Sequence, residues 1–165
     1  MSWYGRDAVE SYPALVARAV KATGLLEESA PFEIKEPIRL YRPARFPRHW
    51  EVTENTVSVE LHSRDALSRS LLVSWVSEGE PHEECICVVK QPCHLGGSRW
   101  WLLCPVSLWL RDRFTGREGW QGCERPQYAL YFRQGRFGCR SCQRLTYRTC
   151  QRGLRARAFE KGLGY

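Results

Sequence analysis

The chain has 165 residues, 43% of them hydrophobic, and a formal net charge of +7. This composition is ordinary for a globular protein, and the length fits one domain or a small domain with an appended module. No apolar run approaches the ~18 residues that a membrane-spanning helix needs, and the first residues lack the apolar stretch of a secretory signal. We therefore expect a cytoplasmic protein that makes no contact with a membrane.

The positive charge is concentrated in the C-terminal part of the chain. Residues 1–98 contain 11 Lys/Arg and 14 Asp/Glu, whereas residues 99–165 contain 14 Lys/Arg and 4 Asp/Glu, a net charge of +10. All of the cations in the second part except Lys161 are arginines. A GC-rich genome would explain the preference for arginine over lysine, but it would not explain the asymmetry. Because arginine matches phosphate and stacks on bases, this asymmetry favours a polyanionic partner.

The first predicted element is a helix near the N-terminus. Ser11 is a suitable N-cap, and Pro13 suits the first turn. Gly24 is expected to end the helix. Its buried face is predicted from apolar residues at helical spacing, namely Leu15, Val16, Ala19 and Val20.

A β region is predicted after a proline-rich linking stretch, which runs from Pro31 to Trp50 and contains one short strand at Ile38 to Tyr41. Within the β region, Val57, Val59 and Leu61 alternate with polar residues, as in a half-buried strand. Further strands are expected at residues 71–76, 85–89 and 99–103. Turn signals lie between these strands, at Asp65, at residues 78–81 and at Gly96-Gly97. Short strands joined by tight turns predict an antiparallel meander.

The last predicted element is a polar, arginine-rich helix from Leu145 to Lys161, which Gly153 interrupts. A weak apolar stripe supports it, formed by Tyr147, Leu154, Ala158 and Phe159. Taken together, the elements predict an α+β fold that is mainly antiparallel β, with an N-terminal helix, a β-meander and a C-terminal zinc ribbon with a short basic helical tail. We expect the helix and meander in residues 1–95, the ribbon in residues 96–147 and the tail in residues 148–165.

The zinc ribbon is predicted from the cysteines. The chain has eight of them, and in a reducing cytosol clustered cysteines favour metal ligation over disulfides. The strongest pattern is the pair Cys139 and Cys142, which follows a hairpin predicted at residues 128–137. A redox pair is the alternative, but such a pair normally opens a helix in a βαβ unit. A hairpin followed by a Cys-x-x-Cys knuckle is the second half of a zinc ribbon, and amides of its turn can donate to the sulfurs.

The first half of the ribbon must supply two more thiolates. Cys104 and Pro105 end a predicted strand, but Ser107 stands at the usual position of the second ligand. Cys123 is the natural replacement, and residues 105–122 then form a loop inserted in the knuckle. Zinc accepts this, because it needs four donors near ~2.3 Å in a tetrahedron and no fixed loop length. We expect one structural zinc ion on Cys104, Cys123, Cys139 and Cys142; the alternative is a degraded knuckle without metal.

The remaining cysteines are expected to have no role in this site. Cys85 and Cys87 share one face of a predicted strand and are expected to pack in the sheet. The alternative is that they form a second metal site with Cys93 and His94. Cys150 has no partner by spacing and is predicted to be a lone thiol.

Two runs in the C-terminal half have a distinctive order of motifs. The first is GGSRWWLLCP at residues 96–105, and the second extends from QYALY at residues 127–131 through FGCRSC to LTY at residues 145–147. Together they resemble a family of largely uncharacterised bacterial and phage proteins with a zinc-ribbon core. In that family a GGxRWW strand enters a CPxxC knuckle, and a Leu-Tyr strand, a CRxC knuckle, an LxY exit and a basic helical tail follow.

The resemblance covers residues 84–157 and implies the same four cysteine ligands, Cys104, Cys123, Cys139 and Cys142. The resemblance implies a zinc-ribbon fold and a bound zinc ion, but it implies no settled activity. The chain departs from the family pattern in the long insert of residues 105–122 and in its short tail.

Binding of DNA or RNA is the function that these features favour. Arginine can contact phosphates, and exposed aromatic rings can stack on unpaired bases. The candidate binding residues lie in the ribbon and its tail: Arg136, Arg140, Arg144, Arg148, Arg152, Arg155 and Arg157. The alternative for each residue is that it binds no partner and is simply a solvent-exposed arginine on the surface of the ribbon.

The second hypothesis is a protein-interaction module, such as a phage or mobile-element accessory protein that docks on a larger machine through the loop 105–122. An enzyme is the least favoured hypothesis. Four thiolates would complete the coordination of zinc and leave no position for water, and no histidine lies between Cys104 and Tyr165.

Overall fold

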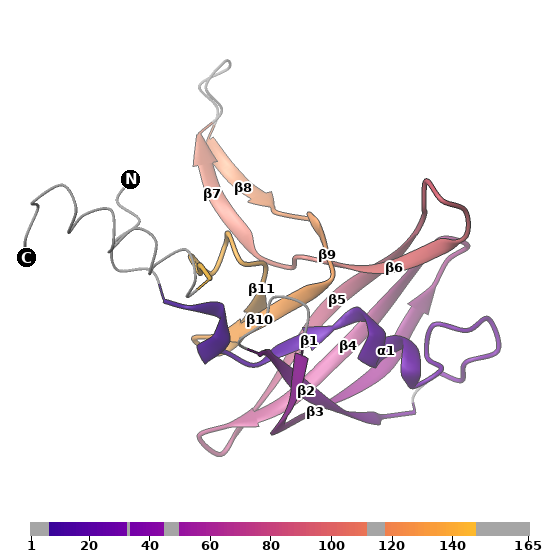
Figure 1. The fold of residues 1–165 in the computed structure, drawn as a ribbon, viewed down its shortest axis with the longest axis horizontal. Helices are drawn as coiled ribbons and strands as arrows, with labels where there is room; N and C mark the ends of the chain where they lie inside the picture. The colour runs from indigo at the N-terminus through magenta and orange to yellow at the C-terminus, as the bar shows by residue number, and fades with distance from the viewer. Residues whose placement is uncertain (1–6, 33, 45–49, 112–117, 148–165) are drawn as a thin grey trace, which may run out of the picture.

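The computed structural model describes residues 7–32, 34–44, 50–111 and 118–147. A nine-stranded sheet dominates it, in the order β11-β10-β1-β2-β3-β4-β5-β6-β9, and β7 and β8 form a separate two-stranded sheet (Figure 1). The paired strands are antiparallel throughout the large sheet. No helix in the described residues is long and apolar enough to cross a membrane.

The N-terminal segment differs from the predicted helix. A short 3-10 helix, η1 (Val9–Ser11), is followed by the strand β1 (Ala14–Val16) and by a six-residue helix, α1 (Ala17–Ala22). All three residues of β1 are buried, and the strand pairs with β10 on one side and with β2 on the other. An apolar run this short fits a buried strand as well as a helix, and here distant strands decide the outcome. Gly24 lies just past α1 at φ +79°, and so ends the helix as predicted.

The predicted antiparallel meander is confirmed. Its strands are β2 (Glu36–Pro43), β3 (Trp50–Arg64), β4 (Ser68–Ser77), β5 (Glu80–Pro92) and β6 (Ser98–Leu103), and each pairs with the next. β2 is longer than predicted, and it is an interior strand of the sheet where a linking stretch was expected. Pro37 and Pro43 lie at its two ends, where a missing N–H is tolerated best.

Two hairpins of the large sheet are held in register by tight turns. Glu78 and Gly79 connect β4 to β5, and both have positive φ, 54° and 84°. Gln134 and Gly135 do the same between β10 (Ala129–Arg133) and β11 (Arg136–Gly138), with φ of 52° and 74°. Two central residues at positive φ define the turn whose twist matches that of antiparallel strands.

The sheet is curled, so that its β11 end turns back over β4 and β5. Trp75 of β4 contacts the ring of Phe137 on β11, with centroids 5.4 Å apart. The backbone N–H of Phe137 donates to Glu84 of β5 at 3.0 Å, and burial raises the pKa of that carboxyl group. The core lies inside the curl, and its largest fully buried members include Leu15, Leu61, Leu71, Ile86, Leu102, Leu130 and Phe137.

Strands from all parts of the described chain share this sheet. β5 and β6 pair across the predicted boundary at residue 95, and β1 pairs with β10. The division into an N-terminal region and a ribbon stays a prediction. The predicted tail helix falls outside the described residues from position 148 on; its first residues, 145–147, are not helical, and Thr146 forms a bridge with Ala8.

Phe137 gives a test of this packing. Its side chain is 0% exposed and lies against Trp75 and Phe132. Phe137→Ala should lower the free energy of unfolding by about 3–5 kcal/mol, because it removes a buried ring and leaves a cavity. Leu95→Ala, at a position that is 87% exposed, should change it by less than ~0.5 kcal/mol. Equal effects of the two substitutions in denaturant titrations would contradict the curled packing.

Candidate metal centre

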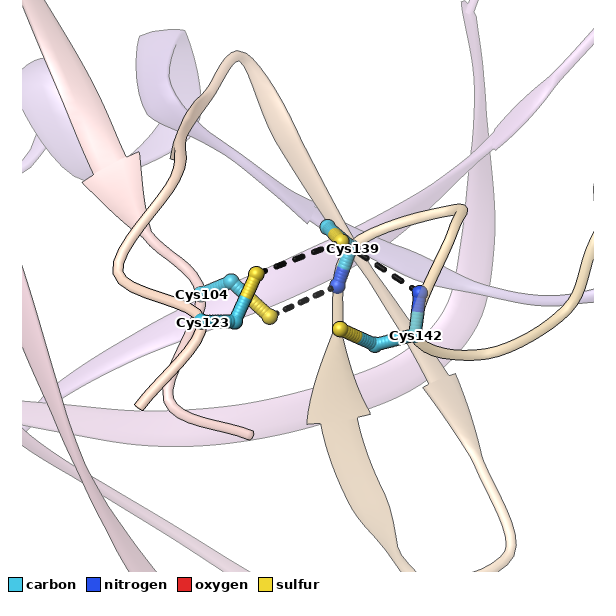
Figure 2. Close-up of side chains that lie close together, drawn as sticks. All are labelled: Cys104, Cys123, Cys139 and Cys142. Carbon is cyan, nitrogen blue, oxygen red and sulfur yellow. Dashed lines mark hydrogen bonds between the residues drawn. The ribbon is translucent and has the colours of Figure 1, made fainter. Parts of the chain in front are cut away.

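Four cysteines meet at one point, as predicted. The sulfurs of Cys104, Cys123, Cys139 and Cys142 all lie within 4.8 Å of one another (Figure 2). The sulfurs of Cys123 and Cys139 are 3.9 Å apart. Four bonds of ~2.3 Å directed to the corners of a tetrahedron put the sulfurs about 3.8 Å apart. The group can therefore hold one metal ion.

The first pair of ligands comes together because the insert between them is itself a hairpin. Residues predicted to form a loop contain β7 (Ser107–Arg111) and β8 (Glu118–Gly122), paired from Ser107↔Gly122 outward. At the base, the Cys123 amide donates to the Val106 carbonyl at 2.8 Å, and the Glu124 amide donates to the Cys104 carbonyl at 3.2 Å. Antiparallel pairing thus returns the chain to Cys104 however long the hairpin is.

The second pair of ligands lies on the tight turn after β11. The Gln143 amide donates to the Cys139 carbonyl at 3.0 Å, and the Leu145 amide donates to the Arg140 carbonyl at 2.9 Å. Gly138 precedes the turn, where a Cβ atom would lie 2.9 Å from a side-chain atom of Val106 and from one of Gln143. A side chain at this position would therefore push the two knuckles apart.

The ligand sulfurs accept hydrogen bonds, one of which joins the two knuckles to each other. The Cys139 amide donates to the Cys104 sulfur at 3.2 Å, and the Cys142 amide donates to the Cys139 sulfur at 3.4 Å. Nε of Arg125 donates to the Cys123 sulfur at 3.3 Å. Such donors spread the negative charge that four thiolates concentrate on one ion, and they orient the ligands. Amide donation from the Cys139–Cys142 turn agrees with the prediction.

The thiols of the cluster differ in how readily they ionise, because the pKa of Cys139 is lowered whereas the pKa values of Cys104 and Cys142 are raised. The hydrogen bond from the Cys104 thiol lowers the pKa of Cys139 to about 4, although burial opposes this. The same hydrogen bond raises the pKa of Cys104. Burial raises the pKa of Cys142 to about 12. Since the thiolate is the form that binds a metal, a cation at the centre must displace the protons that these pKa values retain.

The cluster draws its ligands from the two ends of the curled sheet. Cys104 follows β6, and Cys123 precedes β9 (Pro126–Gln127), the last strand at that end. Cys139 follows β11, the strand at the opposite end of the order. Figure 2 shows the two pairs facing each other from separate segments of the chain. A metal ion bound here would close the curl by joining one end of the sheet to the other.

The structure describes three of the seven candidate nucleic-acid-binding arginines. Arg136, Arg140 and Arg144 are exposed and lie on β11 and the turn that bears the second pair of ligands. The guanidinium of Arg140 stacks over the Tyr147 ring at 4.9 Å. The other four lie outside the described residues: Arg148, Arg152, Arg155 and Arg157.

Arg125 is a residue of the site that the sequence predictions missed. It is exposed and donates to a ligand sulfur. The only sequence signal for this role was the position of Arg125 two residues after Cys123. An arginine so close to a knuckle does not stand out until its hydrogen bond to the sulfur is seen.

The second metal site considered for Cys85, Cys87, Cys93 and His94 does not form in the described residues. There, a single group of metal-binding side chains comes together, and it is the cluster of Cys104, Cys123, Cys139 and Cys142. Cys87 lies inside β5, and Cys93 follows its end. The six residue steps of extended chain from Cys87 to Cys93 span roughly 20 Å. Cys85 and Cys87 are exposed, and Ser70 contacts the Cys85 sulfur at 2.8 Å.

Comparisons with protein-family models, with curated proteins and with solved structures found no match. The resemblance to bacterial and phage zinc-ribbon proteins therefore stays a prediction. The geometry of the cysteine cluster stands independently of it.

Metal binding gives a direct test of the cluster. The purified chain should contain about one metal ion per molecule, measured by elemental mass spectrometry. Cys139→Ser and Cys104→Ser should each remove most of this metal, because a hydroxyl is a poor substitute for a thiolate. Cys85→Ser is the matched control and should retain it, since Cys85 lies outside the cluster. Full metal content in both cluster variants would show that the metal binds elsewhere.

Proposed function

We propose that the chain is a zinc-ribbon-like protein that binds nucleic acid through the arginine-rich side of its metal centre. The observation that carries the proposal is the exposure of Arg136, Arg140 and Arg144 on the segment that the cluster holds in place. The charge of residues 99–165 supports it, since that part has 14 Lys/Arg against 4 Asp/Glu.

The metal that the donor set fits best is zinc. Four thiolates that converge on one point are typical ligands of structural zinc, and they leave no open position for water or substrate. In this role the ion contributes folding energy to the site and takes no part in a reaction. The proposal therefore includes no catalytic step.

The charges near the cluster are available to a partner. Within the described residues, no Asp or Glu forms an ion pair with Arg140 or Arg144. Arg133 is different, because it pairs with Asp7 and donates to the Gln143 carbonyl at 2.5 Å, so its role is structural. Exposed arginines without an acidic partner on a rigid turn can bind phosphate groups bidentately at little cost in side-chain ordering.

A salt series tests the proposal. Binding of labelled DNA and RNA should be strongest at ~50 mM salt and should weaken as counterions compete. The triple substitution Arg136→Ala/Arg140→Ala/Arg144→Ala should lower the slope of log K against log salt by about 0.9 for each duplex phosphate contact that is lost. Absence of wild-type binding at the lowest salt concentration would rule out the proposed function.

The control for this series is Arg39→Ala/Arg42→Ala, which removes two positive charges where the triple substitution removes three. Both residues are exposed on β2, in the part of the chain where acidic residues outnumber basic ones. This control should leave affinity and slope unchanged. An equal loss per removed charge in both variants would mean that net charge alone, rather than the surface near the cluster, determines binding.

A further inference from the structure

The strands β7 and β8, together with residues 105 and 106 before them, form an arm in the described residues 105–111 and 118–122. It pairs with no strand of the large sheet, and Figure 1 shows it extending away from that sheet. Trp109 and Trp120 are register partners on the arm, and they are 55% and 72% exposed. Tryptophan is normally a highly buried residue. Two of them exposed side by side indicate a contact surface.

The two rings contact each other directly. Their centroids are 5.6 Å apart, and their planes cross at 77°. An edge-to-face contact is a favourable geometry for aromatic rings, so it holds the pair in shape. It also leaves flat ring surface exposed, because the contact uses the edge of one ring and one face of the other. Gly122 follows on the same face of β8 as Trp120 and adds no side chain beside the ring.

The charges at the base of the arm indicate the kind of partner. The arm starts and ends at Cys104 and Cys123, so the cluster fixes its base. The exposed Arg125 lies five residues beyond Trp120, at most about 17 Å along an extended chain. Arg140 is exposed on the opposite knuckle. Planar rings on an arm that has cations near its base complement a ligand with planar groups along an anionic backbone, which is the chemistry of nucleic acid.

We propose that Trp109 and Trp120 form a base-stacking platform, and that the protein therefore prefers single-stranded to duplex nucleic acid. Duplex bases already stack on one another and hide their faces, whereas unpaired bases present them to an aromatic side chain. The inference rests on the proposed nucleic-acid-binding function and specifies its ligand. The arginines near the cluster supply phosphate contacts to either form, and the tryptophans supply the discrimination.

Binding to two matched ligands tests the platform. The ligands are a labelled oligothymidine and a duplex of the same length, about 20 nucleotides, which exceeds the ~4–16 nucleotides of a typical single-strand binding fold. Wild-type protein should bind the single strand more tightly. Trp109→Ala and Trp120→Ala should each weaken single-strand binding roughly 5- to 100-fold and leave duplex binding unchanged. The phenylalanine substitutions should recover part of the loss, because a smaller ring still stacks.

Two controls separate the outcomes. The first is Leu95→Ala, which removes an exposed apolar side chain from another loop and should leave both affinities unchanged. The second is the metal content, which should be equal in all variants.

Equal wild-type affinity for both ligands, unaffected by the tryptophan substitutions, would overturn the platform and leave the proposed function standing. Failure of the wild type to bind either ligand would overturn both. Self-association that the tryptophan substitutions abolish, with single-strand affinity intact, would assign the arm to a protein contact and overturn the platform.

Discussion

Convergence of four sulfurs at one point sets the geometry of the C-terminal half of this protein. Cys104 and Cys123 come from the β6–β9 end of the sheet order, and Cys139 comes from the β11 end. Four thiols this close are unfavourable partners once they ionise, because like charges would repel at short range. A divalent cation reverses the sign of that interaction. A bound ion would hold the ends of the curled sheet together, in addition to the contacts of Phe137 with Trp75 and Glu84.

Two surfaces depend on that closure. The turn with Arg140 and Arg144 is positioned by the second pair of ligands, and the arm with Trp109 and Trp120 projects from the first pair. The cluster therefore sets the relative placement of the cations and the aromatic rings. In the proposed function, a metal site with a closed coordination shell would affect binding through this placement, without contacting the ligand. In the proposed function the metal acts as a scaffold, and the arginine and tryptophan side chains make the contacts.

The local features of the fold could be predicted from the sequence. Alternation at Val57, Val59 and Leu61 identified a strand, and Glu78-Gly79 identified a turn that the structure confirms. The four ligands were also predictable, because a Cys-x-x-Cys pair after a hairpin demands two partners and zinc imposes no limit on the loop between them. Cys123 could be found by elimination once Ser107 was seen at the expected position.

The non-local features could not be predicted in this way. Ala14–Val16 is a strand because β10, more than 100 residues later, supplies its hydrogen-bonding partner, and no local pattern carries that information. The hairpin nature of the insert was hidden because Gly119 and Gly122 weaken the strand signal of β8. The role of Arg125 depends on a contact with a sulfur, and the structural use of Arg133 depends on Asp7, 126 residues away. Such pairings follow from the curl of the sheet and become visible with the fold.

X-ray absorption at the metal edge of the purified, metal-loaded chain addresses the coordination directly. If the cluster holds zinc as the geometry indicates, the zinc-edge spectrum should show a single shell of four sulfur neighbours at about 2.3 Å, with no light-atom ligand. A shell that contains nitrogen or oxygen, or fewer than four sulfurs, would contradict closure of the sheet by Cys104, Cys123, Cys139 and Cys142.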